Sequence, residues 1–234
     1  MEIKILGICG TPVKGEVTNT EHMLRATIKG CEQYAAQYGD RVKADVVLLG
    51  EKKVVSGCTH CNWCLEHQTA GVYCSVKDDI SKEIYSKIIE ADGLILSTPV
   101  YIGGMSWLMA ALIHRMRALA EGRYYGIRGP YGGVLQDKVL AATSVAWVRH
   151  AGVETAMLTE LLAGFVFDMV ITTAGLEGIY GAGGVSAAPL GQLVGVQKDR
   201  IALASCRSIG KRVVERCRII KAGKKALEYF PAYL

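Results

Sequence analysis

The feature that most constrains this chain is a regular alternation of short apolar runs with longer amphipathic stretches. Apolar runs typical of strands occupy 3–9, 42–49, 93–100, 138–145 and 167–174. Apolar residues recur at helical spacing over about 19–38, 77–91, 105–121, 151–163 and 198–222. Strands that alternate with helices form parallel sheets, and the unbroken run "GLILSTPV" is typical of a strand buried on both faces. The sequence therefore predicts an α/β fold, a doubly wound five-stranded parallel sheet with helices on both faces.

Length and composition predict one domain over 1–234. The chain has 234 residues, of which 50% are hydrophobic, and this is enough for one compact core. The start, "MEIKILGICG", enters a strand pattern at once and contains no secretory signal. Glu160 and Asp168 interrupt the most apolar long stretch, which argues against a membrane span. We therefore expect a cytoplasmic protein without a membrane partner.

The formal net charge of +5 comes largely from the basic stretch "KRVVERCRIIKAGKK". Ile209, Val213, Cys217 and Ile220 recur there at helical spacing, which leaves the basic residues on the opposite face. A solvated helix face explains this pattern better than a nucleic-acid site, and we expect no nucleic-acid partner.

Four of the eight cysteines lie close together in "GCTHCNWCLEHQTAGVYCSVKDD". They are Cys58, Cys61, Cys64 and Cys74. Intracellular thiols stay reduced, so clustered cysteines more often bind a metal or do redox work than form disulfides. Three of the others, Cys31, Cys206 and Cys217, fall on apolar helix stripes or near them and are expected to be small core residues.

Three loops at the carboxyl ends of the predicted strands carry candidate binding residues, because doubly wound sheets bind ligands there. The loop "GICGTPVKGEVTNT" (7–20) combines glycines, hydroxyls, one Lys and a helix start, which suit a phosphate; an ordinary capped turn is the alternative. The loop "STPVYIGGMSW" (97–107) offers an aromatic side chain and two glycines for a flat ring, or is a tight turn. The loop at 143–154 supplies hydroxyls, Trp147 and His150, and we expect this histidine to be a surface residue.

With these loops in place, the chain resembles the NADPH-dependent FMN reductase superfamily of flavodoxin-like folds, and more narrowly the iron–sulfur flavoproteins. The family's phosphate loop, approximately G-x-S-G-S-P-R-x-x-G-N-T, is matched by "GICGTPVKGEVTNT", with Cys9 at the usual serine and an unusual acid at Glu16. The family's S-P-V-Y-F-G loop is matched by Ser97 and "TPVYIGG", and its K-D-D-M by "KDDI". The resemblance implies an FMN site formed by Cys9, Thr11, Lys14, Asn19, Thr20, Pro99, Val100, Tyr101, Ile102, Gly103, Thr143 and Ser144.

The resemblance also implies a purpose for the cysteines, because this subfamily inserts a C-x2-C-x2-C motif with a fourth cysteine to hold a [4Fe–4S] cluster. The ligands would be Cys58, Cys61, Cys64 and Cys74, in a cluster loop at 57–76 after the second strand. Gly57 and Gly71 would allow its turns. Zinc sites usually pair two C-x2-C knuckles, so the third cysteine favours iron–sulfur. Zinc, with His60 or His67 as substitute ligands, and no metal remain alternatives.

The implied function is an electron-transfer flavoprotein with FMN and one [4Fe–4S] cluster. It would pass electrons between a one-electron donor such as ferredoxin and a two-electron acceptor. The rival interpretation is an NAD(P)H-dependent FMN or quinone reductase whose cysteine loop is vestigial or binds structural zinc. Family members are dimers or tetramers, and the glycine-rich, nearly uncharged segment 175–195 is consistent with a covered subunit interface or with a lid over the flavin.

Overall fold

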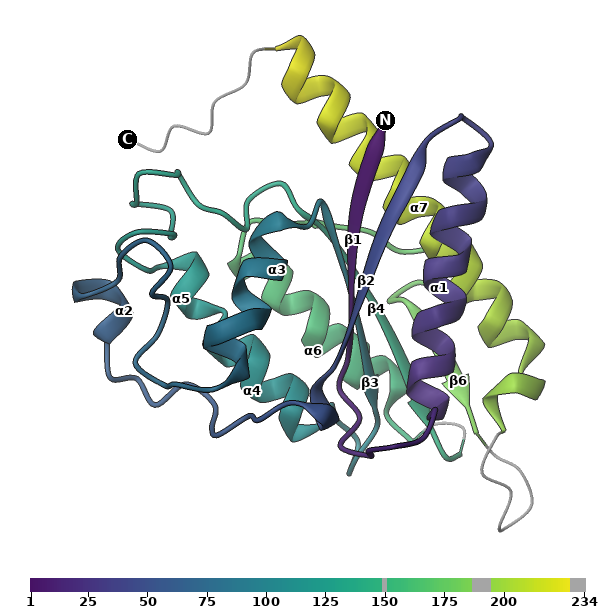
Figure 1. Cartoon of the computed structure of the whole chain (residues 1–234). Coiled ribbons are helices and arrows are strands. Elements are labelled where there is room, and N and C mark those ends of the chain that lie inside the picture. The colour runs from purple at the N-terminus through teal and green to yellow at the C-terminus, as the bar shows by residue number, and fades with distance from the viewer. Residues whose placement is uncertain (149–150, 187–194, 228–234) are drawn as a thin grey trace.

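The computed structural model describes residues 1–148, 151–186 and 195–227, and these form a six-stranded sheet wrapped by helices (Figure 1). The strands are β1 (Glu2–Cys9), β2 (Arg41–Leu48), β3 (Gly93–Pro99), β4 (Val139–Ala146), β5 (Val170–Ile171) and β6 (Ala182–Val185). All pairs are parallel, in the order β2-β1-β3-β4-β5, with β6 also paired to β4. This is the flavodoxin-like strand order, and it confirms the predicted fold class.

The fifth predicted strand is shorter in the structure than expected. A strand was expected over 167–174, but only Val170–Ile171 pairs with β4. The chain then leaves the sheet and returns as β6 beside Thr143–Ala146 of the same strand. Gly175 and Gly181 take positive φ angles of 61° and 136° on this excursion, which glycine does at little cost. The sequence of β6, AGGV, has no strand pattern, so β6 was missed within 175–195; residues 187–194 lie outside the described part.

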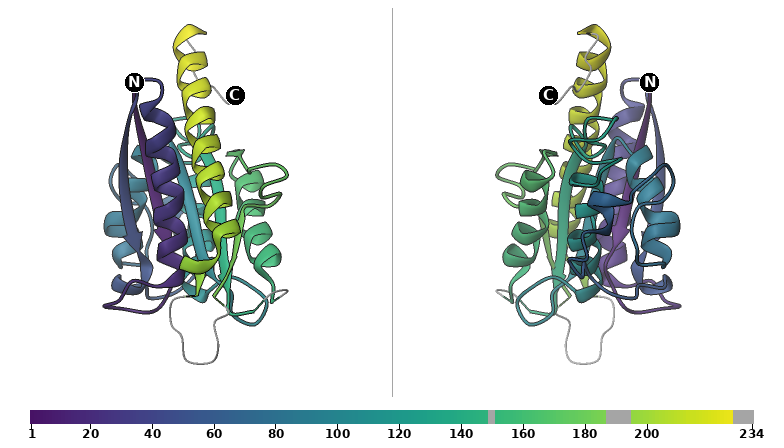
Figure 2. Two further views of the ribbon diagram at one scale, coloured as in Figure 1. Left: turned by 90° about the vertical axis from the view of Figure 1, so that its right-hand side faces the viewer. Right: turned by 90° about the vertical axis from the view of Figure 1, so that its left-hand side faces the viewer.

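Helices cover both faces of the sheet (Figure 2). On one face α1 (Asn19–Ala36) and α7 (Arg200–Ala226) pack side by side. The other face carries α3 (Tyr85–Glu90), α4 (Trp107–Arg115), α5 (Arg117–Ala120) and α6 (Val153–Val166). Four short helical turns complete the set: η1 (Leu49–Glu51), α2 (Trp63–Glu66), η2 (Ile80–Ile84) and η3 (Val196–Lys198). The helix predicted over 77–91 therefore begins at η2, and the one predicted over 105–121 breaks between α4 and α5.

The contact between α1 and α7 is close because glycines face it. A Cβ on Gly30 would lie 2.5 Å from the backbone oxygen of Arg207, and one on Gly210 would lie 2.1 Å from that of Thr27. Only glycine fits at such approaches. Cys31, Cys206 and Cys217 are buried in the apolar core on this face, as expected of small core residues.

The basic stretch lies on α7 with the predicted orientation. Ile209, Val213 and Cys217 are buried against the core, while Lys211 and Arg212 are exposed. The interpretation as an amphipathic helix face is therefore confirmed. In the described ranges, none of the helices has the length and apolar character needed to cross a membrane.

Candidate functional site

The loop from β1 to α1 forms one wall of an open cleft at the carboxyl ends of the strands. Thr11, Asn19 and Thr20 line this cleft, whose open volume is about 960 Å³. The Thr18 hydroxyl caps α1 by accepting a hydrogen bond from the Glu21 amide at 3.3 Å. The positive end of the α1 dipole therefore faces the cleft, as at phosphate sites.

The predicted residues of this loop do not all reach the cleft. Cys9 is fully buried at the end of β1, and burial raises the pKa of its thiol to about 12. Lys14 is exposed and does not line the cleft, whereas Glu16 does. Glu16 is the one charged side chain among the described lining residues. The Gly15 amide donates to the Glu51 carboxylate at 2.8 Å, which ties the loop to η1.

The loop after β3 forms a second wall. Pro99, Val100 and Tyr101 line the cleft, and burial, with a smaller effect of the Cys9 thiol, raises the pKa of Tyr101. Ile102 and Gly103 occupy the tip of the turn with positive φ angles of 48° and 77°. Tyr101 and Gly104 close this turn with backbone hydrogen bonds of 2.9 and 3.1 Å. The Ile102 side chain is fully exposed and neither tip residue lines the cleft.

The end of β4 supplies the third wall through Val145, Ala146 and Trp147, and Ser186 after β6 joins them. Thr143 and Ser144 directly precede Val145 on β4 and are fully buried. His150 lies outside the described residues. The sequence pattern did not indicate Ser186, because no strand was expected before it.

Buried hydroxyls connect the three loops beneath the cleft. Thr143 Oγ1 donates to Ser97 Oγ at 2.8 Å, and Ser97 donates onward to the Thr20 carbonyl at 3.0 Å. Ser144 donates to the Thr98 carbonyl at 3.1 Å. Ser106, the N-cap of α4, donates to the Gly10 carbonyl at 2.6 Å. Thr143 and Ser144 thus support the cleft from below; sequence reasoning missed Ser106, whose only signal was its place before a helix.

The four clustered cysteines line one pocket at the C-terminal end of α4. Cys58, Cys61, Cys64 and Cys74 all line it, and its cavity volume is about 20 Å³. The loop turns sharply here, with positive φ angles at His60, Asn62 and Gly71. The pKa values of Cys61 and Cys64 change in opposite directions. Hydrogen bonds, mainly that with the Ser75 hydroxyl, lower the pKa of Cys61, whereas burial raises the pKa of Cys64.

The donor set of this pocket fits a thiolate-bound metal centre, although its side chains are not arranged around an ion. Within 1–148, 151–186 and 195–227 no three Cys, His, Asp or Glu side chains are close enough to chelate a metal together. Arg115 and Arg117 also line the pocket, and such cations offset the charge of thiolates. His60 and His67 are exposed and do not line it.

Gln68 fixes the middle of the cysteine loop. Its side chain is 1% exposed and donates from Nε2 to the carbonyls of Tyr73 (2.9 Å) and Ala118 (2.7 Å). Its Oε1 accepts from the amides of Tyr124 (3.0 Å) and Tyr125 (2.9 Å). One buried amide therefore joins the loop to α5 and the segment that follows α5.

Asp78 and Arg115 form a buried ion pair at the end of the loop. The Asp78 carboxylate also accepts from the amides of Val55 (3.0 Å) and Ser81 (3.4 Å). Burial works to raise the pKa of Asp78, but the hydrogen bond and charge of Arg115 and the two amides bring it below its usual value. The neighbouring carboxylate, Asp79, accepts from the Lys53 amide at 2.7 Å.

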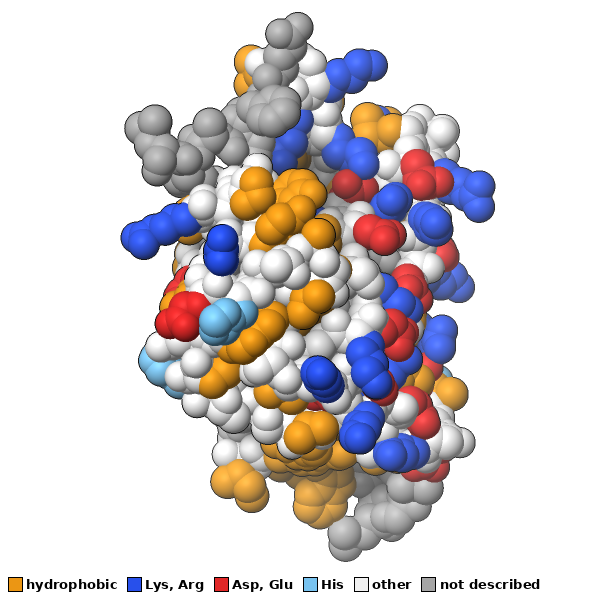
Figure 3. Space-filling view, turned by 60° about the vertical axis from the view of Figure 1, so that its left-hand side comes forward, with side chains coloured by type: hydrophobic (Ala, Val, Ile, Leu, Met, Phe, Trp, Pro, Cys, Tyr) orange, Lys and Arg blue, Asp and Glu red, His pale blue; other side chains and the backbone are white. Residues whose placement is uncertain are grey.

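Helix α4 connects the two sites. Its N-cap Ser106 lies beneath the cleft, and its last residue, Arg115, lines the cysteine pocket. At 1.5 Å per residue these ends are about 13 Å apart along the helix. Figure 3 shows a face on which apolar side chains gather beside histidines, with a mixed band of basic and acidic side chains along one margin.

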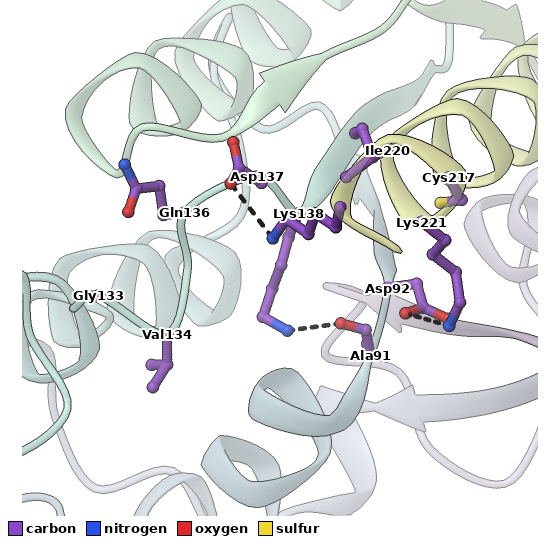
Figure 4. Close-up of a pocket in the computed structure, with 11 residues that line it drawn as sticks. Ala91, Asp92, Gly133, Val134, Gln136, Asp137, Lys138, Cys217, Ile220 and Lys221 are labelled. Atoms are coloured by element: carbon purple, nitrogen blue, oxygen red, sulfur yellow. Dashed lines mark hydrogen bonds and ion pairs between the residues drawn. The ribbon is translucent and has the colours of Figure 1, made fainter. Parts of the chain in front are cut away.

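Another pocket lies between α7 and the chain before β4 (Figure 4). Lys138 Nζ donates to the carbonyl of Ile89 at 2.7 Å and to that of Ala91, and burial lowers its pKa to about 8. Lys221 pairs with Asp92 at 2.8 Å on the opposite wall. None of the residues predicted to bind a cofactor lies here. The Lys221–Asp92 pair joins α7 to the turn before β3, and Lys138 joins the start of β4 to the end of α3.

Comparisons with known proteins agree with this arrangement. The sequence profile of the NADPH-dependent FMN reductase family matches residues 3–176. An iron–sulfur flavoprotein of Archaeoglobus fulgidus is 32% identical over 212 residues, covering 90% of this chain and 95% of that protein. An iron–sulfur flavoprotein of Methanocaldococcus jannaschii is 29% identical over 221 residues, covering 94% and 100%.

Solved structures support the fold. RosB with bound 8-demethyl-8-formylriboflavin-5'-phosphate matches with a TM-score of 0.69 at 14% identity, over 99% of this chain and 90% of that chain. An NAD(P)H:quinone oxidoreductase from Methanothermobacter marburgensis matches with a TM-score of 0.56 at 12% identity, over 91% and 100%. From the family profile and its close relatives, the chain is a flavin-dependent oxidoreductase that belongs to the iron–sulfur flavoproteins of the NADPH-dependent FMN reductase family.

Proposed function

We propose that this chain transfers electrons between a one-electron donor such as ferredoxin and a two-electron acceptor, with FMN in the cleft and one [4Fe–4S] cluster in the cysteine pocket. The observation that carries the proposal is that four cysteines, one of them ten residues from the next, line a single pocket joined by α4 to the cleft. When bound, FMN exchanges electrons singly or in pairs and the cluster exchanges them one at a time.

The chain's own part is to bind and to orient. The α1 N-terminus with Thr11, Asn19 and Thr20 would hold the phosphate. Pro99, Val100 and Tyr101 would hold the ring. The thiols of Cys58, Cys61, Cys64 and Cys74 would bind iron. We further propose that 1–234 acts as one domain, with 57–76 as the cluster loop.

The proposed partners follow from the surface. Lys53 and Lys77 are exposed beside the cysteine loop, where an acidic donor would be attracted, while Lys52 is already paired with Glu83 at 2.7 Å. Four apolar side chains of α6 are exposed, which suits a homo-oligomer, dimer or tetramer. They are Leu158, Leu162, Phe165 and Val166. All eight cysteines are free thiols, as in the reducing cytoplasm where we place the protein.

The alternative is an NAD(P)H-dependent FMN or quinone reductase with structural zinc or no metal in the loop. The form without a metal is supported by the thiols, which among the described residues do not converge as a chelate. Anaerobic purification followed by iron, sulfide, zinc and flavin analysis separates the two. We expect about four irons, four sulfides and one FMN per chain; zinc, or no metal, with FMN would support the alternative.

A further inference from the structure

Arg115 lines the cysteine pocket and has one unpartnered donor. The side chain is almost fully buried, at 1% exposure, and lies at the end of α4. Its Nη1 donates to Asp78, and its Nη2 donates to the Ser81 hydroxyl at 2.7 Å and to the Val76 carbonyl at 3.3 Å. Its Nε is buried and has no hydrogen-bond partner in the described chain.

An unpartnered buried donor is costly. Leaving such a group without a partner costs about 1–3 kcal/mol, and more when the group is charged. Most buried polar groups in proteins are therefore satisfied, and an exception calls for a ligand or a function. The other two guanidinium nitrogens of Arg115 already bind the segment 76–81, which follows the cysteine loop, so the guanidinium is fixed in place.

The pocket that Arg115 lines contains acceptors of the right kind. The four cysteines line the same space, and Cys74 lies two residues before Val76, whose carbonyl accepts from the guanidinium. Burial works to lower the pKa of Arg115, but Asp78, Tyr85 and Cys74 raise it above its usual value, so the group is a permanent cation beside that thiol. Sulfur ligands of iron–sulfur clusters accept such hydrogen bonds, and these stabilise the reduced cluster.

We propose that Arg115 is a positioning residue for the cluster, and that its Nε–H donates a hydrogen bond to the sulfur on the Cys74 side and so raises the reduction potential. This rests on the proposed function. Asp78 neutralises the charge of the guanidinium, which leaves the directed hydrogen bond as its specific effect on the cluster.

Two variants of the anaerobically purified holoprotein test this. Arg115→Lys keeps the charge and removes the Nε donor. The double variant Arg115→Met with Asp78→Asn removes both charges together, so the net charge of the wall is unchanged and no lone carboxylate is left buried. The midpoint potential of the cluster is measured by redox titration followed by electron paramagnetic resonance, with iron, sulfide and FMN counted in each sample.

We expect both variants to shift the cluster to a lower midpoint potential than wild type, with FMN content unchanged. The matched control is Arg123→Lys, since Arg123 binds the Glu66 carbonyl of the loop at 2.9 Å but does not line the pocket. Its potential should equal that of wild type. Unshifted potentials in iron-replete Arg115→Lys and in the double variant would overturn the inference alone. Wild-type protein that lacks iron and sulfide would overturn the proposed function and the inference with it.

Discussion

The cleft at the strand ends and the cysteine pocket are built in different ways. The cleft is formed where three parallel strands end together, and buried hydroxyls such as Ser97 and Ser106 tie its loops to one another. The cysteine pocket lies on a long excursion from the sheet, held by single side chains such as Gln68 and Arg115. The cleft therefore depends on the sheet as a whole, and the pocket on a few buried contacts.

Buried charge separates the two regions as well. Beside the pocket, Asp78 is paired with Arg115, which helps to lower the pKa of its carboxyl. On the same face of the sheet, α6 covers β4, and Glu160 of α6 is fully buried with neither carboxylate oxygen partnered by the described residues. Burial raises the pKa of Glu160 well above its usual value, so this carboxyl is neutral where Asp78 is charged.

The largest expected effect is in the cysteine pocket. Cys58→Ala, Cys61→Ala and Cys64→Ala should each abolish the cluster, because a lost thiolate leaves an iron open to solvent, while FMN stays bound at the separate cleft. Iron, sulfide and flavin analysis measures this. Cys74→Ala tests the fourth ligand in the same way.

The buried cysteines provide the control. Cys31→Ala and Cys217→Ala should leave iron content unchanged and cost only modest stability, because both are small core residues. Full iron–sulfur content in all four pocket variants would contradict the cluster assignment.

Gln68→Ala should produce the next largest effect, a loss of about 2–4 kcal/mol in the free energy of unfolding. The change leaves two carbonyls and two amides of the loop region without their buried partner. Denaturant unfolding of the cluster-free protein measures it. Gln33→Ala, at an exposed position of α1, is the control and should change little. A loss no greater than that of the control would show that the loop does not depend on this side chain.

Glu160→Gln should stabilise the protein increasingly as the pH rises. In wild type the unfolded chain ionises near the ordinary pKa of Glu, while the folded chain keeps its proton, so stability is fully present below that pKa and falls by up to about 1.4 kcal/mol per pH unit above it. The fall ends at the raised folded pKa. The difference between variant and wild type, measured by unfolding between about pH 5 and pH 8, should therefore grow with pH. A difference that does not change with pH would contradict the buried assignment.

Asn19→Ala should have the smallest effect, weakening FMN binding by about 1 kcal/mol, or roughly fivefold in Kd. Its side chain lines the cleft, and its Oδ1 accepts from the Val196 amide at 3.3 Å, so the change removes one polar contact and loosens η3. Quenching of flavin fluorescence measures the affinity. Thr159→Ala, exposed on α6, is the control. Equal affinity in the two variants would place the phosphate elsewhere.

The sequence by itself determined the parts of the molecule that local chemistry governs. Apolar runs identified β1 to β4, and the runs of β3 and β4 are nearly unbroken because strands covered by helices on both faces are buried over their length. The spacing of Cys58, Cys61 and Cys64 identified the cysteine loop, because ligands from one short segment leave their pattern in the sequence. Asn19 and Thr20 were named through the family resemblance of the loop at 7–20, which lies at the junction of a strand pattern and a helix pattern.

Only the tertiary structure decided what depends on residues far apart in the chain. The AGGV strand β6 forms because β4 offers it a free edge, not because its residues favour a strand. Thr143 and Ser144 were expected at the cleft, but the register of β4 with β3 places them beneath it, bonded to Ser97 and Thr98. Arg115 binds Asp78 across 37 residues of sequence, and Gln68 binds the Tyr125 amide across 57 residues. No local sequence pattern predicts a hydrogen bond across such a separation. A buried polar group is satisfied by whatever the folded chain brings beside it, and that is settled only by packing.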